Sequence, residues 1–112
     1  MHDYKIDPAQ ALKARLNQET ARLPFAELLR YYAAGSVIKV ANQLDLVDVA
    51  VQFALDKKEQ VAAWMQAGQV QRASDADGAR WQAQDAALWA VVVSPWVLVQ
   101  EEKPAHLGHT LQ

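Results

Sequence analysis

The sequence predicts an α+β fold: an antiparallel or mixed sheet of about four to five strands with helices packed on it, in the order α-α-β-β-α-β-α-β(β). Two observations carry this prediction. Residues 25–32 place apolar side chains at helical spacing, whereas residues 88–93 are wholly apolar and rich in valine, which is typical of a central strand. A chain of 112 residues suits a single domain. We therefore expect one domain over residues 8–101, a loose N-terminus over 1–7 and a flexible tail over 102–112.

Two helices are predicted at the start of this domain. The first begins with Asp7 as its N-cap and Pro8 at its first helical position. Its narrow apolar stripe consists of Leu12, Leu16 and Leu23. Pro24 disfavours helical geometry at the residue before it, so a second helix is expected from Pro24 to Ala34, with Gly35 as a left-handed cap. The apolar face of this second helix consists of Phe25, Leu28, Leu29 and Tyr32.

A β-hairpin is predicted over residues 36–55. Residues 36–41 are rich in β-branched side chains, which favours a strand. In residues 47–55 every odd position is apolar, and this period of two is typical of a half-buried strand. A helix is the competing interpretation, because Asp45 could cap one and Asp48 would lie in its first turn. Three valines at alternate positions favour the strand.

The second half of the chain predicts two more helices and further strands. A helix is expected over residues 57–67, a short strand around Val70, and then a helix capped by Ser74. The apolar central strand follows. Because Pro95 cannot donate a ladder hydrogen bond, it marks either a sharp bend in one long strand or a turn before a second strand over 96–100.

Composition and charge argue against several classes of partner. The chain has no cysteine, which excludes thiol catalysis, disulfides and cysteine-based zinc sites. The formal net charge is −2 and the basic residues are scattered, which argues against a nucleic-acid partner and against membrane anchoring. The glycines are isolated, so no phosphate-binding loop can be built from them. We therefore expect no cofactor and no metal. Neither a signal pattern nor an apolar run long enough to cross a membrane is present, so we also expect the protein to be cytoplasmic.

Five stretches of the chain form a recognisable set: residues 17–22, 35–38, 44–47, 67–70 and 88–101. With them the sequence resembles a family of small uncharacterised bacterial proteins, classed only as a domain of unknown function. The closing motif PWVLVQE is the most specific part of this resemblance, which extends over about residues 12–102. The resemblance implies a bacterial, cytosolic, stand-alone domain and carries no implication about chemistry.

Side chains suited to acid–base catalysis are scarce in the predicted domain. All three histidines (His2, His106 and His109) fall in the predicted tails, outside the expected core. The pair Asp75 and Asp77 is better explained by helix capping than by metal binding. The sequence therefore predicts no catalytic residue, and it favours a protein that is not an enzyme.

Tryptophan and arginine supply the candidate binding residues. Trp96 follows the proline, where its side chain could be directed outward, and tryptophan is favoured at binding interfaces. Arg22 and Arg80 are the cations best placed to flank an anionic pocket, although they could equally be surface residues in weak pairs. The speculative binding set is Arg22, Glu27, Arg80, Trp81 and Trp96.

Two hypotheses about function follow. The first is a non-enzymatic interaction module that forms a homo-oligomer. The apolar run 91–99 would be an aggregation hazard on a sheet edge, so it must be central or covered by another subunit. The second is a small-ligand-binding protein or weak enzyme, with a pocket near Arg22, Glu27, Arg80 and Trp96.

Overall fold

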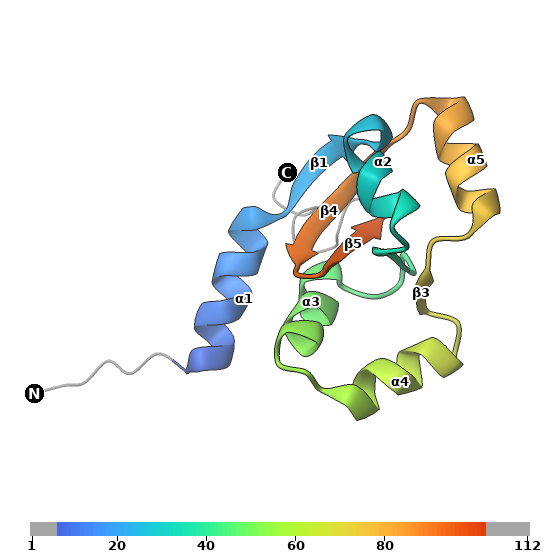
Figure 1. Ribbon diagram of the computed structural model, residues 1–112. Helices are drawn as coiled ribbons and strands as arrows, with labels where there is room; N and C mark the ends of the chain where they lie inside the picture. Colours follow the sequence, from blue (N-terminus) through green and yellow to red (C-terminus); the bar gives the residue numbers. More distant parts are fainter. Residues whose placement is uncertain (1–6, 103–112) are drawn as a thin grey trace, which may run out of the picture.

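The structure is a computed structural model that describes residues 7–102 (Figure 1). Its helices are α1 (Pro8–Glu19), α2 (Phe25–Ala33), α3 (Leu46–Ala54), α4 (Lys58–Gln66) and α5 (Asp75–Gln84). Its strands are β1 (Ala21–Pro24), β2 (Val37–Val40), β3 (Val70–Arg72), β4 (Ala87–Val93) and β5 (Trp96–Gln100). The three histidines and nearly all of both predicted tails lie outside the described residues. Over residues 7–102, no helix has the length and apolar character needed to cross a bilayer.

The strands form one mixed sheet in the order β1-β4-β5-β2-β3. Strands β2 and β5 pair in parallel, and the other neighbouring pairs are antiparallel. This arrangement confirms the predicted α+β class with helices packed on a mixed sheet. Ser94 and Pro95 form a turn between two strands rather than a bend in one, and the peptide bond between them is cis.

Both faces of the sheet are covered by helices, so the fold has three layers. One core contains residues of α1 and α3, packed on sheet residues such as Ile38 and Leu98. The second core lies on the opposite face, where Phe25 of α2 and Trp81 of α5 pack on sheet residues such as Val97. The alternation of side chains along each strand divides the apolar residues between these two cores.

Residues 47–55 do not form the predicted strand; they belong to helix α3. Asp45 is its N-cap, and its carboxylate accepts hydrogen bonds from the backbone N–H groups of Val47 at 2.9 Å and Asp48 at 3.1 Å. The prediction was wrong because α3 is apolar on several sides: it contacts α1, α4 and the sheet. Leu46 and Ala50, at even positions, are as deeply buried as the odd-numbered valines. A half-buried strand would have turned those even positions towards solvent.

The first helix is shorter than its apolar stripe predicts. Helix α1 ends at Glu19, and Thr20 caps it with its hydroxyl donating to the carbonyl of Leu16 at 2.8 Å. Leu23 lies in the edge strand β1, opposite Leu88 of β4, and packs in the second core. Leu16 and Leu23, although seven residues apart, therefore do not lie on one face of a helix. Hydrogen bonding to β4 determines the conformation of this segment.

The apolar run 91–99 is central in the sheet. It forms the last three residues of β4 and the first four residues of β5, and both strands lie in the interior of the sheet. The outer strands are the short β1 and β3. Strand β5 pairs with a strand on each side, but β1 pairs only with residues 87–90 of β4, so residues 91–93 have a strand partner only on the β5 side. The chain itself therefore covers both edges of the β5 part of this run and one edge of the β4 part.

Candidate functional site

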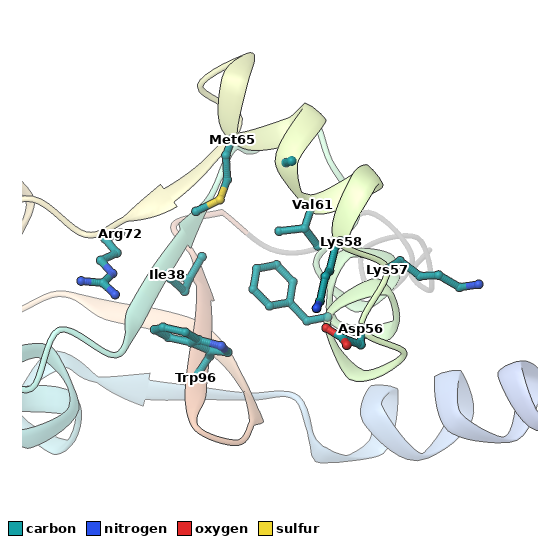
Figure 2. A pocket seen from close by; sticks show the side chains of 10 residues that line it. Ile38, Asp56, Lys57, Lys58, Val61, Met65, Arg72 and Trp96 are labelled. Atoms are coloured by element: carbon teal, nitrogen blue, oxygen red, sulfur yellow. The ribbon is translucent and has the colours of Figure 1, made fainter.

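A pocket of about 390 Å³ lies between the sheet and helix α4. We call it the Trp96 pocket. It is lined by Ile38, Phe53, Asp56, Lys57, Lys58, Val61, Ala62, Met65, Arg72 and Trp96. Figure 2 shows strand residues on one side of this space and residues of α4 on the other. Its volume falls in the range typical of small-molecule sites.

Three neighbouring strands supply the sheet side of the Trp96 pocket. Ile38 of β2 lies directly opposite Arg72 of β3, so both side chains project from the same face. Trp96 is the first residue of β5, which pairs with β2. Its side chain is half-buried and packs against the first core. The guanidinium carbon of Arg72 lies 5.5 Å from the centre of the Trp96 ring. This cation–π contact places a positive charge beside an apolar surface.

The end of α3 and the start of α4 form the opposite side. Asp56 has a φ of 56°, the left-handed conformation that often follows a helix. Lys57 is the N-cap of α4 and makes no side-chain capping bond. Val61 and Met65, four residues apart, lie on one face of α4 and line the pocket, and Met65 is 46% exposed. The pocket thus has an apolar interior and charged groups near its rim.

The charged groups of the Trp96 pocket carry an excess of positive charge. The lining residues include three cations, Lys57, Lys58 and Arg72, and one carboxylate, that of Asp56. None of these four side chains forms an ion pair within residues 7–102. Arg72 and Lys58 lie on opposite sides of the pocket, with Ile38 and Trp96 between them, whereas Lys57 points away (Figure 2). The arrangement is suited to hold an anion over an apolar surface.

The structure does not bring the five predicted binding residues into one pocket. Trp96 lies on the α4 side of the sheet, whereas Trp81 is buried in the second core on the opposite side. Arg22 and Trp81 line a different hollow of about 360 Å³, together with Glu101. Glu27 is an exposed residue in the first turn of α2. The predicted pocket near Arg22, Glu27, Arg80 and Trp96 is therefore corrected: Trp96 is separate from the rest.

Arg80 and Trp81 are bound into a charge network rather than free for a ligand. Arg80 donates to the carboxylate of Asp77 at 3.3 Å and also pairs with Glu101. The indole N–H of Trp81 donates to the same Glu101 carboxylate at 2.8 Å. Burial alone would raise the pKa of Glu101, but the bonds from Arg80 and Trp81 hold that pKa below its usual value. These contacts link α5 to the end of β5.

Asp77 is the buried centre of this network. Lys39 donates to its carboxylate at 2.8 Å, and the backbone N–H of Ser74 donates to it at 2.9 Å. The Ser74 hydroxyl accepts from the Asp77 N–H at 3.0 Å, which completes a capping box. Burial would raise the pKa of Asp77, but these donors lower it from 3.8 to about 2. The capping role predicted for Asp77 is confirmed.

No group of three or more histidine, cysteine or acidic side chains suited to metal binding occurs in the part of the chain that the structure describes.

Sequence reasoning found Trp96 but missed the other residues of its pocket. Arg72 follows Val70 by two positions in a strand, so period-two alternation would have placed both on one face of the sheet. Val61 and Met65 show helical spacing towards the same side of α4. The sequence alone does not combine these signals, because the location of α4 depends on α3, and the alternating pattern of residues 47–55 predicts a strand there.

The fold and the pocket define the class of this protein: a three-layer α+β domain with an amphipathic, net positive pocket against one face of a mixed sheet. The family described as "Protein of unknown function (DUF2288)" matches residues 11–101, and the chain belongs to this family. Its fold is similar to the NMR solution structure of PA1075 from Pseudomonas aeruginosa, at 38% sequence identity and a TM-score of 0.73. That similarity covers 92% of this chain and 94% of the other. No curated protein matches.

Proposed function

We propose that this protein is a non-enzymatic binding module that takes a small ligand into the Trp96 pocket. The observation that carries the proposal is a half-buried tryptophan beside an arginine that forms no ion pair within residues 7–102, both on strands of the sheet, in a pocket open to solvent. Tryptophan and arginine are the side chains most enriched at binding hot spots. Sites formed on strands hold their side chains more rigidly than sites on loops.

The side chains of the pocket favour binding over catalysis. Among the ten lining residues there is no hydroxyl, imidazole or thiol side chain. The pocket therefore lacks the usual pairing of a nucleophile with an activating base. It offers apolar surface, the cations of Arg72 and Lys58 and the carboxylate of Asp56, which can recognise a ligand and hold it in place. We include a bacterial, cytoplasmic setting in the proposal, and the similarity to a Pseudomonas protein supports the bacterial part.

The proposal is tested by a fragment screen followed by two tryptophan variants. Fragments that raise the melting temperature should also shift the indole N–H resonance of Trp96 in ¹H–¹⁵N spectra, because ligands stabilise the state they bind. Trp96→Leu should weaken the binding of these fragments by about tenfold or more, as expected for a hot-spot aromatic residue.

Trp64→Leu is the matched control for this test. Trp64 also packs at the edge of the first core, but it lines a different hollow, next to α1. This variant should leave fragment binding unchanged. A screen in which no fragment shifts the Trp96 resonance would overturn the proposal, and so would hits that Trp64→Leu weakens as much as Trp96→Leu.

Self-association remains a separate proposal. The apolar run 91–99 lies in the interior strands β4 and β5, although residues 91–93 have no strand partner on the β1 side, and β1 and β3 are outer strands of the sheet in residues 7–102. A second copy could extend the sheet along either strand. Sedimentation at micromolar concentration should then give the mass of a dimer. A single species of 12.4 kDa at all concentrations would contradict self-association and leave the ligand proposal intact.

A further inference from the structure

We infer that the ligand of the Trp96 pocket is a small monocarboxylate with an apolar body, and that its carboxylate pairs with Arg72. This inference rests on the proposed function and adds the chemical class of the ligand. It depends on three features of the pocket: the arginine, the charges at the start of α4, and the apolar surface between them.

Arg72 is placed to bind a carboxylate. Its guanidinium lies over the Trp96 ring, 5.5 Å from the ring centre, and it has no ion pair with any carboxylate in residues 7–102. A cation–π contact does not use the N–H groups of the guanidinium as donors to an acceptor atom, so they stay available for hydrogen bonds. These N–H groups form a fork that matches the two oxygens of a carboxylate. The backbone of Arg72 is fixed by its pairing with Ile38 in the sheet.

At the start of α4, the side chain of Lys58 adds positive charge on the other side of the pocket, while that of Lys57 points away from it. Lys57 and Lys58 occupy the N-cap and first position of this helix, where the helix dipole is also positive and cations are unfavourable. Helix stability therefore does not account for two lysines at this end. Glu59 in the same turn offsets part of this charge, but it is not among the residues that line the pocket. An anionic group in the pocket would relieve the repulsion.

The apolar surface of the pocket indicates that the rest of the ligand is apolar. Ile38, Val61 and Met65 face the space between Arg72 and Lys58 (Figure 2). A free inorganic anion would leave this surface exposed, whereas a ring or short alkyl chain would cover it. Burial of that surface contributes about 25 cal/mol per Å². One charged end and one apolar body therefore match the two halves of the pocket.

Three ligands that share one apolar body test the charge preference. They are 4-phenylbutyrate, 4-phenylbutanol and 4-phenylbutylamine, which are anionic, neutral and cationic at pH 7. Titrations followed by the Trp96 indole resonance should give an affinity for the carboxylate about tenfold higher than for the alcohol, because charge-assisted hydrogen bonds are the stronger ones. The amine should bind more weakly than the alcohol. The advantage of the carboxylate should shrink as salt is added.

Variants of the charged residues locate the interaction. Arg72→Gln should lower the affinity for 4-phenylbutyrate to that for the alcohol and leave alcohol binding unchanged. Arg15→Gln, at an exposed position of α1, changes the net charge equally and should have no effect. Asp56→Asn should raise the affinity for the carboxylate about twofold, since it removes the opposing charge. Asparagine tolerates the left-handed φ of 56° at this position, so the fold should be kept.

The outcomes separate this inference from the proposed function. Equal affinity for the three ligands at the Trp96 resonance would overturn the carboxylate inference while the binding function stands. The carboxylate inference would also be overturned if 4-phenylbutyrate did not shift the Trp96 resonance while other fragments did. It would be overturned as well if the Arg72→Gln variant bound 4-phenylbutyrate with unchanged affinity. If no fragment and no ligand perturbs Trp96, the proposed function itself fails.

Discussion

Gly78→Ala should destabilise the protein by about 2–3 kcal/mol, although the change improves helix propensity by about 1 kcal/mol. Gly78 lies in α5 where the helix crosses Tyr32 of α2. A Cβ at this glycine would lie 2.1 Å from the Tyr32 hydroxyl oxygen and 2.3 Å from the ring carbon that carries it. The ring cannot move freely, because its hydroxyl donates to the carbonyl of Ser74 at 2.9 Å and it packs edge-on against Phe25. Urea denaturation measures the effect.

Two controls isolate the steric cause. Ala83→Gly, at an exposed position of the same helix, should cost no more than about 1 kcal/mol and so reports propensity alone. In a Tyr32→Ala background, Gly78→Ala should be neutral or stabilising, since the clashing ring is gone. A stabilising effect of Gly78→Ala in the wild-type background would show that α2 and α5 do not cross as closely as described.

Asp77→Ala should cost about 2–3 kcal/mol of unfolding free energy at pH 7. The change removes the capping box of α5, which is worth about 1 kcal/mol, and leaves the partly buried ammonium of Lys39 without its ion-pair partner. Asp75→Ala is the matched control, because Asp75 lies exposed in the same first turn and contributes only through the helix dipole. It should cost under about 1 kcal/mol. Equal losses for the two variants would contradict the network.

The contribution of Asp77 should also depend on pH in a defined direction. Its pKa is about 2 in the folded protein and 3.8 ordinarily, so the folded state favours the carboxylate. The stabilisation is therefore fully present above about pH 5 and is lost as pH falls through the folded pKa. The gap between the two pKa values corresponds to about 2 kcal/mol. The difference in unfolding free energy between wild type and Asp77→Ala should shrink by this amount on acidification, and a difference that stays constant would contradict the assignment.

Local signals predicted much of this fold. Ser74 followed by Asp77 determines the start of α5, and the valine-rich stretch that forms β4 is an interior strand of the sheet. The segment from 47 to 55 was mispredicted because a helix buried on several sides carries apolar residues at nearly every position. Such a pattern fits periods of two and of 3.6 equally well, and only the cap at Asp45 distinguishes them.

The site was less predictable than the fold because it depends on tertiary neighbours. Arg72 and Trp96 are far apart in sequence, and only the placement of β3 and β5 on either side of β2 brings them together. The reverse holds for Arg80, which the sequence offers as a free cation. A bond to Glu101, distant in the chain, binds it into the structural network. Propensity and periodicity describe the faces of single helices and strands. They do not predict that Arg72 contacts Trp96 or that Arg80 pairs with Glu101.

The most direct test of the Trp96 pocket is a set of intermolecular NOEs between 4-phenylbutyrate and the protein at saturating ligand. The phenyl protons should show NOEs to the Trp96 ring and to the methyl groups of Val61 and Met65, and the protons beside the carboxylate should lie near the side chain of Arg72. NOEs confined to the hollow beside Arg22 and Trp81, on the other face of the sheet, would contradict this assignment and place binding elsewhere.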